Sequence, residues 1–410
     1  MMREWILGVA RGYEGGPALL LAGRAVQLVN GLLLSIILVQ RFGLAALGTF
    51  AIGLAAVNII AIVCPLGLHN HLPRLRQSLA QSSYAGLVLQ IVQLPLVALL
   101  LWPYAALLAH DAGEARIIYA VALSGFFIGL GNMGMMLAIM HRRFGVGLAA
   151  PLCETAGMLA GTVLAATPAG FAVYLLLARL ASATLIWSGF HYQRLPAARL
   201  RGIARASVHY VVNDTLTVAP EQAAPLLLAT VVSRGELGLF RLCQQLLMAA
   251  DTPVWTFVQS RYPRMVDGDA EFHAGLARQV DRMALLASVA CVGGSAVLAL
   301  VFFGAPQLAL LMLVLSPCLL WRYRAYLYGQ ALRASGRLAA VTQLAATRLV
   351  LALAALTIAT ERFGLWGAVV TVALLSVATG TAYEWTFRHG VTLRPARLIP
   401  HTANSVTSDQ

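Results

Sequence analysis

The sequence alternates between long apolar blocks and short polar segments. A helix needs about 20 apolar residues to cross the hydrocarbon core of a membrane, and about twelve blocks of the chain reach that length. These blocks lie at roughly 17–40, 44–66, 84–109, 115–140, 145–167, 169–192, 207–232, 236–260, 282–304, 306–332, 337–360 and 363–388. The pattern predicts an all-α integral membrane protein with about 12 transmembrane helices.

The inner loop around 193–206 divides these blocks into two sets of six. An internal repeat supports the division, since identical residues recur 190 positions apart, among them Gly48 and Gly238, Phe50 and Phe240, Pro73 and Pro263, Arg74 and Arg264. We therefore predict a six-helix bundle over 1–195, a cytoplasmic linker over 196–206, a second six-helix bundle over 207–388 and a disordered cytoplasmic tail over 389–410. Two halves related by a repeat are typical of alternating-access transporters, which hold their substrate near the midplane between the halves.

The composition agrees with this pattern. Mean hydropathy is +0.78, 60% of the residues are hydrophobic and 11% are charged, whereas a soluble protein has about 25% charged residues. An ordinary soluble protein is thereby excluded. The five cysteines all lie in apolar blocks without a CxxC pair, which is typical of small core residues rather than of disulfides or a zinc site. We predict no metal and no cofactor.

Positive charge is distributed unevenly between the two sets of loops. All 29 basic residues are arginine, and if the N-terminus is inside, 19 of them fall in the inner loops and tails. Four fall on the outer side, namely Arg41, Arg116, Arg234 and Arg362. Because cytoplasmic loops carry the excess of basic residues, both termini are predicted to be cytoplasmic. This asymmetry also accounts for most of the net charge of +13, so no nucleic-acid partner is expected.

Six arginines lie inside the apolar blocks: Arg24, Arg179, Arg241, Arg322, Arg324 and Arg348. At the bilayer centre one arginine costs roughly 2.5–3.5 kcal/mol, so these side chains are expected to face water, an anion or a counter-ion. A guanidinium group binds phosphate oxygens bidentately and stays charged at depth. Arg24, Arg179, Arg348 and Arg241 are therefore predicted to bind an anionic substrate such as a diphosphate. The alternative is that they pair with carboxylates of the protein or reach the interface.

The block at 306–332 contains a run of aromatic and basic residues, WRYRAYLYGQ. Trp321, Arg324 and Tyr328 are spaced i, i+3 and i+7 and share one face of a helix. Aromatic rings beside an arginine suit the binding of sugar rings, so these three residues are candidate substrate ligands. The alternative is an aromatic belt at the membrane interface, with Arg322 and Arg324 extended towards the head groups.

Four carboxylates lie inside the apolar blocks: Glu154, Asp214, Glu221 and Asp251. Pro220 and Pro225 remove backbone hydrogen bonds beside Glu221, and freed carbonyl groups are tolerated at this depth only when buried in protein or facing water. Glu221 and Asp251 are expected at similar depth on consecutive helices. The four carboxylates are predicted to form a coupling site for a proton or another cation. The alternative is that each neutralises an arginine such as Arg241.

Three stretches resemble bacterial polysaccharide flippases. They are RFGLAALGTF with PLGLHNHLPRLR within 41–76, GELGLFRLCQQLLMAADTPVWTFVQSRYPRM at 235–265, and LRASGR with ERFGLWGAVVTVALL within 332–375. Those flippases are the Wzx-type O-antigen, capsule and exopolysaccharide repeat-unit translocases of the multidrug/oligosaccharidyl-lipid/polysaccharide (MOP) exporter superfamily. The resemblance implies two six-helix bundles in a V shape, with the first and seventh spans facing a central cavity and Arg24 in that cavity. It also implies an undecaprenyl-diphosphate-linked oligosaccharide as cargo.

We therefore predict that the protein flips such a repeat unit from the cytoplasmic to the periplasmic leaflet of the bacterial inner membrane, for the synthesis of lipopolysaccharide or exopolysaccharide. We expect a monomer among membrane lipids that acts with the polysaccharide polymerase and glycosyltransferases of its pathway and is not itself an enzyme. The alternatives are a drug or cation antiporter of the same superfamily and a polysaccharide polymerase, ligase or sugar transferase. Such enzymes need a large outer loop or a catalytic acid near the outer surface, where the chain has Asp111, Glu114, Glu236 and Glu361.

Overall fold

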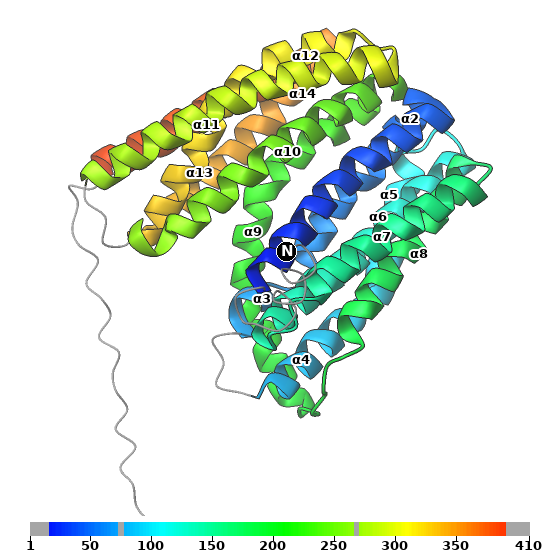
Figure 1. Cartoon of the computed structure of the whole chain (residues 1–410), viewed down its shortest axis with the longest axis vertical. Helices are drawn as coiled ribbons and strands as arrows, with labels where there is room; N and C mark the ends of the chain where they lie inside the picture. The colour runs from blue at the N-terminus through cyan, green and yellow to red at the C-terminus, as the bar shows by residue number, and fades with distance from the viewer. Residues whose placement is uncertain (1–15, 73–77, 266–269, 391–410) are drawn as a thin grey trace, which may run out of the picture.

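The computed structural model describes residues 16–72, 78–265 and 270–390. Every regular element in these ranges is helical (Figure 1): α2 Gly16–Val63, α3 Leu68–His71, α4 Leu79–Ile91, α5 Leu94–Leu108, α6 Ala112–Met140, α7 Val146–Leu164, α8 Pro168–Trp187, α9 Ala197–Val231, α10 Arg234–Met265, α11 Ala270–Val297, α12 Gln307–Leu315, α13 Leu319–Ala334 and α14 Leu338–Gly390. A π segment, Leu298–Phe303, continues α11, and a 3₁₀ turn, Ser316–Cys318, joins α12 to α13. Pro73, Arg74 and nearly all of the predicted tail lie outside the described ranges.

Two of the helices are far longer than one membrane crossing. α2 has 48 residues and α14 has 53, whereas about 20 suffice. Each breaks at a glycine with positive φ, Gly43 at 84° and Gly364 at 54°, a conformation that glycine adopts without the strain of a Cβ. Arg24 and Ala61 line one cavity from opposite sides of Gly43 in the sequence. The chain therefore reverses at Gly43, and α2 holds two of the predicted spans.

In the described ranges, eight helical segments are long and apolar enough to cross a membrane. α9 and α10 correspond to the predicted spans at 207–232 and 236–260 but are not among the eight, because their charged and polar residues lower the mean hydropathy. α9 also includes most of the predicted linker, since it begins at Ala197; this stretch is rich in alanine, leucine and arginine, which favour helix. The structure thus confirms an all-α membrane protein, while the count of twelve spans stays a prediction.

The helices form two groups that meet at one end of the molecule and separate at the other (Figure 1). We call residues 16–196, with α2 to α8, the N-half, and residues 197–390, with α9 to α14, the C-half. The reversal of α2 lies at the end where the halves meet, which we call the closed end. The separated end carries α3, α4 and the loops that the arginine distribution predicts to be cytoplasmic. The V shape implied by the resemblance is therefore present.

Two glycines of the internal repeat hold the halves together at the closed end. A Cβ at Gly48 would overlap the carbonyl oxygen of Arg234, and a Cβ at Gly238 would overlap the carbonyl oxygen of Leu44. These contacts are reciprocal, because Arg234 follows Leu44 by the same 190 positions that separate Gly238 from Gly48. The repeat therefore packs against itself, and α2 crosses α10 backbone to backbone.

A buried ion pair joins the halves at the same end. Arg234 is 8% exposed and donates from Nη2 and Nε to the two oxygens of Glu114, at 3.0 and 3.1 Å. It also donates to the carbonyl oxygens of Leu108 and Ala229, while the Thr49 hydroxyl donates to Glu114 at 3.1 Å. Residues from α2, α5, α6, α9 and α10 thus converge on one bidentate pair, the geometry in which an arginine binds a carboxylate best.

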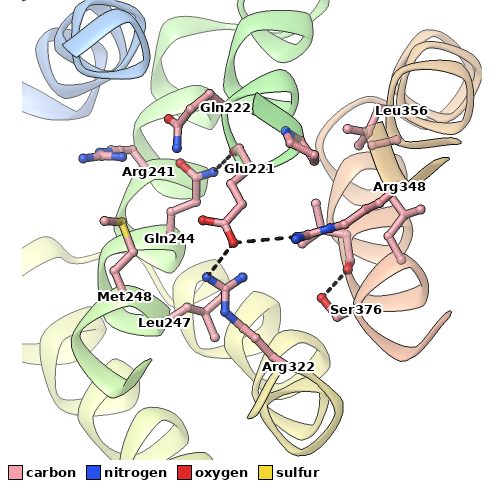
Figure 2. Close-up of a pocket in the computed structure, with 14 residues that line it drawn as sticks. Glu221, Gln222, Arg241, Gln244, Leu247, Met248, Arg322, Arg348, Leu356 and Ser376 are labelled. Carbon is pink, nitrogen blue, oxygen red and sulfur yellow. Dashed lines mark hydrogen bonds and ion pairs between the residues drawn. The ribbon is translucent and has the colours of Figure 1, made fainter. Parts of the chain in front are cut away.

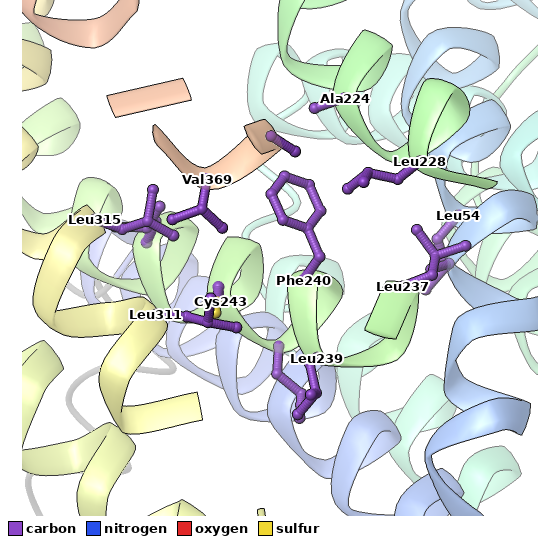
Figure 3. Close-up of a cluster of buried hydrophobic side chains, with 14 of the residues drawn as sticks. Leu54, Ala224, Leu228, Leu237, Leu239, Phe240, Cys243, Leu311, Leu315 and Val369 are labelled. Atoms are coloured by element: carbon purple, nitrogen blue, oxygen red, sulfur yellow. The ribbon is translucent and has the colours of Figure 1, made fainter. Parts of the chain in front are cut away.

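Apolar side chains from both halves pack into one large cluster. Figure 3 shows Phe240 of α10 within it, close to Leu228 of α9 and Leu237 of its own helix. Phe50, the repeat counterpart of Phe240, is equally buried, and its ring centroid lies 6.1 Å from that of Phe171. Both phenylalanines of the repeat therefore serve the core. All five cysteines are free, and Cys64, Cys243 and Cys291 are buried.

The glycine crossing generates a first prediction. Gly48→Val places a branched side chain where the Arg234 carbonyl group lies, so α2 and α10 must move apart. We expect a lower midpoint of thermal unfolding for the protein purified in detergent, and the same result for Gly238→Val. Gly293→Val is the matched control, because a Cβ at Gly293 of α11 meets open space. A Gly48→Val protein with the wild-type midpoint would show that the close approach is not required.

The ion pair generates a second prediction. Removing one partner of a buried pair leaves the other charge unpaired and costs roughly 3–5 kcal/mol. Arg234→Ala and Glu114→Ala should each destabilise the protein, and the double variant should lose less than the two single losses together. Arg116→Ala, which removes an exposed arginine from the same end of α6, should have little effect. Additive losses in this double-mutant cycle of unfolding midpoints would exclude the coupling.

Candidate functional site

A cavity of about 620 Å³ lies among α2, α6, α7 and α8 of the N-half, with α9 and α10 at its edge. Arg24, Glu154, Arg179 and Glu221, four of the residues selected from the sequence, line it together. Asn30 and Asn58 add uncharged polar groups to the wall. We call this space the large cavity. It lies in the size range of ligand-binding pockets in proteins, about 300–1,000 Å³.

The two arginines of the large cavity differ in their surroundings. Arg24 is exposed, and its Nη1 donates to Gln27 Oε1 at 3.1 Å. Arg179 is 7% exposed; its Nε donates to Glu154 Oε1 at 3.0 Å and its Nη1 to the Ser124 hydroxyl at 2.6 Å. Arg179 is thus neutralised inside the protein, as the alternative interpretation foresaw, whereas Arg24 is directed to the space that a ligand would fill.

A smaller pocket of about 50 Å³ lies in the C-half, among α9, α10, α13 and α14. We call it the C-half pocket. Figure 2 shows Glu221 at its centre, with Arg322 and Arg348 directed towards one carboxylate oxygen. The distances from Glu221 Oε1 are 3.2 Å to Arg322 Nη2 and 3.6 Å to Arg348 Nη2. Because Glu221 lines both spaces, it stands between the C-half pocket and the large cavity.

Glu221 and Asp251 meet at one arginine, as their similar depth led us to expect. Arg322 Nε donates to Asp251 Oδ2 at 2.6 Å, and the Tyr326 hydroxyl donates to the same oxygen at 3.1 Å. The structure therefore brings together two of the predicted coupling carboxylates, while their titration stays a prediction. Asp214 lies in α9, but its side chain is not among those that the structure describes.

Arg322 is the residue that sequence reasoning missed. It was not among the candidate ligands, and the interface was the alternative considered for it, yet its side chain is 14% exposed and pairs with Glu221 and Asp251. The spacing did hold the signal: two positions apart on a helix means about 200° of rotation, so Arg322 and Arg324 face opposite sides. Tyr326, one turn after Arg322, marks the inward face.

Arg324, Trp321 and Tyr328 lie away from both cavities. Arg324 Nη2 lies 2.9 Å from Asp281 Oδ2, and its Nη1 lies 3.2 Å from Glu384 Oε2. Tyr328 is buried, with its ring centroid 5.5 Å from that of Phe387, and the backbone of Trp321 packs against Gly380. These three residues share one face of α13, but that face does not reach either cavity because α11 and α14 cover it. Their role as sugar ligands stays a prediction.

Arg241 is not neutralised by Asp251 or Glu221, contrary to the alternative that we considered. Both carboxylates pair with Arg322, which lies closer to them, and Figure 2 shows the Arg241 side chain directed away from Glu221. Arg241 is 7% exposed, and among the described residues no acceptor lies within hydrogen-bond distance of its Nε. It lines the C-half pocket. In the part of the protein that the structure describes, this buried guanidinium group therefore stands beside the network without a counter-ion.

Comparison with known proteins identifies the fold. No protein family and no curated protein matches the sequence. An inward-facing multidrug resistance MATE family transporter of the MOP superfamily superposes with a TM-score of 0.72 at 12% identity, over 90% of this chain and 94% of that one. The lipid II flippase MurJ, in an inward closed conformation, also gives 0.72, at 10% identity over 90% of this chain and 87% of that one. The chain has the fold of MOP superfamily transporters.

The conformation is also defined by this comparison. An outward-facing MATE family transporter of the same superfamily gives a TM-score of 0.53 at 14% identity, over 93% of this chain and 97% of that one. The lower value agrees with the closed end described above, because an outward-facing molecule separates its halves at the other side. The structure therefore superposes better on this inward-facing neighbour than on the outward-facing one.

The Arg179–Glu154 pair generates a third prediction. Arg179→Ala leaves Glu154 unpaired and should lower the midpoint of thermal unfolding, whereas Arg179→Ala with Glu154→Gln removes both charges and should recover part of the loss. If Arg179 lines the transport pathway, the double variant stays inactive in a cellular transport assay despite its recovered stability. Recovery of both stability and transport would assign Arg179 a structural role only.

Proposed function

We propose that the protein is an alternating-access transporter that moves an undecaprenyl-diphosphate-linked oligosaccharide from the cytoplasmic to the periplasmic leaflet of the bacterial inner membrane. The observation that carries the proposal is the excess of positive charge at the two adjoining cavities. Five arginines stand there against three carboxylates whose side chains are described: Arg24, Arg179, Arg241, Arg322 and Arg348, with Glu154, Glu221 and Asp251. A diphosphate diester would supply the missing negative charge.

The large cavity accounts for the head group of this cargo. The exposed Arg24 is suited to take the first phosphate, because a guanidinium fork binds two phosphate oxygens at once. Gln27 and Asn132, both exposed on the cavity wall, offer hydrogen bonds to sugar hydroxyl groups. The prenyl chain stays in the surrounding lipid, where its burial costs nothing. Arginine-rich walls and a polar lining together suit an anionic sugar-phosphate better than an apolar drug.

The direction of transport follows from the arginine distribution and the shape. In the predicted topology the separated end of the V faces the cytoplasm, so the large cavity receives cargo from that side (Figure 1). Rocking of the halves would then open the closed end to the periplasm. This motion requires Arg234 and Glu114 to part, together with the hydrogen bonds from Gln245 to the Gly31 carbonyl and from Asn58 to Gln222.

The alternative functions have less support. A cationic drug would meet the surplus of arginines in the C-half pocket, where Arg241, Arg322 and Arg348 stand with Glu221. A polymerase, ligase or sugar transferase would need a free acid near the outer surface, yet Glu114 is paired with Arg234, Asp111 accepts the backbone N–H of Glu114 at 2.8 Å, and Glu236 accepts from Ser233 at 2.8 Å. These three acids cap helices and join them, whereas Glu361, the fourth outer acid, is exposed near Gly364. MurJ and the MATE transporters share the fold at 10–14% identity, so the choice of cargo rests on the charges of this chain.

Complementation of a flippase-null strain tests the proposal. We expect Arg24→Ala to abolish or strongly reduce export, because the variant loses the exposed arginine that binds the cargo phosphate. Lipid-linked repeat units should then accumulate in the cytoplasmic leaflet. Arg348→Ala should show the same defect. Arg41→Ala, which changes an exposed arginine beside the Gly43 turn, is the matched control. Full export by both cavity variants would remove the anionic-cargo proposal, and loss of function in Asp111→Asn with unaffected cavity variants would favour an enzyme.

A further inference from the structure

The C-half pocket contains a donor that the protein itself does not satisfy. Arg241 is more than nine-tenths buried, lines the pocket and has an Nε without an acceptor among the described residues. Gln244 lines the same pocket, with an Oε1 that is buried and also lacks a partner. A buried polar group without a hydrogen bond is costly, and a buried charge without a partner costs more. This pairing of a free cationic donor with a free acceptor suits an oxyanion that carries a hydroxyl group or a water molecule.

The pocket also has a suitable size. A buried water needs roughly 10–15 Å³ of such space, and the C-half pocket has about 50 Å³. That is room for a single phosphate group but not for a sugar ring. The pocket adjoins the large cavity through Glu221, Gln222 and Met248, which line both. A phosphate bound on Arg24 in the large cavity therefore has a second position deeper in the C-half.

Glu221 occupies the centre of this second position. Its Oε1 is shared by Arg322 and Arg348 (Figure 2), so one carboxylate oxygen stands where an oxygen of a bound anion would stand. Arg322 keeps a second carboxylate, Asp251, at 2.6 Å. Arg348 has Glu221 as its ion-pair partner among the described residues. Releasing Glu221 would thus free Arg348 at the centre of the pocket, while Arg241, with its guanidinium group turned away from Glu221, adds positive charge to the pocket wall.

We infer that the C-half pocket is a second oxyanion site, for one phosphate group, and that Glu221 is a built-in competitor for it. Protonation of Glu221 removes the negative charge, frees Arg348 and opens the pocket to the anion. One proton then enters with each phosphate that reaches this position, which couples cargo movement to proton uptake. The inference rests on the proposed function for the identity of the cargo, but the pocket itself is defined by Arg241, Arg348 and Glu221.

The sign of the pH dependence follows from the groups around Glu221. Those are Arg322 and Tyr326 of α13, Arg348 of α14, and Asp251 and Arg241 of α10. Glu154 and Arg179 of the N-half line the large cavity, which Glu221 also lines. Arg322 and Arg348, the two arginines in contact with Glu221, favour its charged form, so Glu221 competes with an anion at neutral pH. Acid pH should therefore strengthen anion binding in the wild-type protein, because protonated Glu221 no longer competes.

Binding to the full-length protein in nanodiscs tests the inference, with inorganic diphosphate and farnesyl diphosphate as probes. At neutral pH, Glu221→Gln should bind inorganic diphosphate roughly tenfold more tightly than the wild type, since an ion pair no longer has to be broken. The ratio of the Glu221→Gln affinity to the wild-type affinity should approach one at acid pH. Because both proteins bind the same probe, this ratio does not depend on the titration of the probe itself. Glu361→Gln is the matched control and should keep the wild-type pH dependence, because Glu361 is exposed and lines neither the C-half pocket nor the large cavity.

Arg241→Gln provides a second test that leaves the Glu221 ion pairs in place. It should weaken diphosphate binding, and in the Glu221→Gln background it should remove the gain. Thermal unfolding of each variant confirms that the proteins compared are folded. Equal affinities of Glu221→Gln and wild type at neutral pH would overturn the inference, as would a Glu221→Gln gain that survives Arg241→Gln.

The two probes separate this inference from the proposed function. Binding of both diphosphates with the predicted dependence on Glu221 supports a lipid-linked source of the phosphate. Binding of inorganic diphosphate alone, with the same dependence, keeps the pocket but contradicts the lipid-linked cargo. Loss of export in Arg24→Ala together with unchanged diphosphate binding in Glu221→Gln would support the lipid-linked cargo and contradict the oxyanion site in the C-half pocket.

Discussion

The close approach of α2 and α10 is the constraint on which the rest of the structure depends. Gly48 and Gly238 let the two backbones touch. Gly48 packs against Arg234, the first residue of α10, and Gly238 packs against Leu44, beside the reversal of α2. A side chain at either position would hold the halves apart. Because the contact lies at one end of both helices, the halves pivot apart towards the other end, and the polar cavities form in the space that results. The Arg234–Glu114 pair closes the same end, so packing and charge act on one hinge.

The charges inside the protein are arranged in partly balanced sets. Arg179 has Glu154, and Arg322 has Asp251 and Glu221. These pairs let arginines remain at membrane depth, where an unpaired one is expensive. The balance is incomplete at Arg24 and Arg241, one exposed to the large cavity and the other buried beside the C-half pocket. A transporter for an anion needs this incompleteness, since fully neutralised arginines would have no affinity left for cargo.

Several features were predictable because lipid imposes simple rules on sequence. Hydropathy located the helices, and counting from helix ends placed Arg24, Arg179 and Glu221 at depths that bring them to one cavity. The repeat in Gly48 and Gly238 pointed to two related halves, which their reciprocal contact explains. Arg322 was left out of the candidate ligands although it pairs with Glu221 and Asp251. Arg324 was grouped with Trp321 and Tyr328, and the structure pairs it with Asp281 and Glu384.

The sequence by itself determined the helices, the breaks between successive spans near 41–43 and 361–362, and the presence of more arginines than carboxylates inside the apolar blocks. These properties can be read from the length and composition of each apolar block. Only the tertiary structure decided which carboxylate neutralises which arginine, and that none of the described carboxylates neutralises Arg241. The reason is rotational: lipid and protein interior are both apolar, so a membrane helix carries little periodic signal of the face that it turns inward. Ion pairs depend on that rotation, and it is set by packing against neighbouring helices.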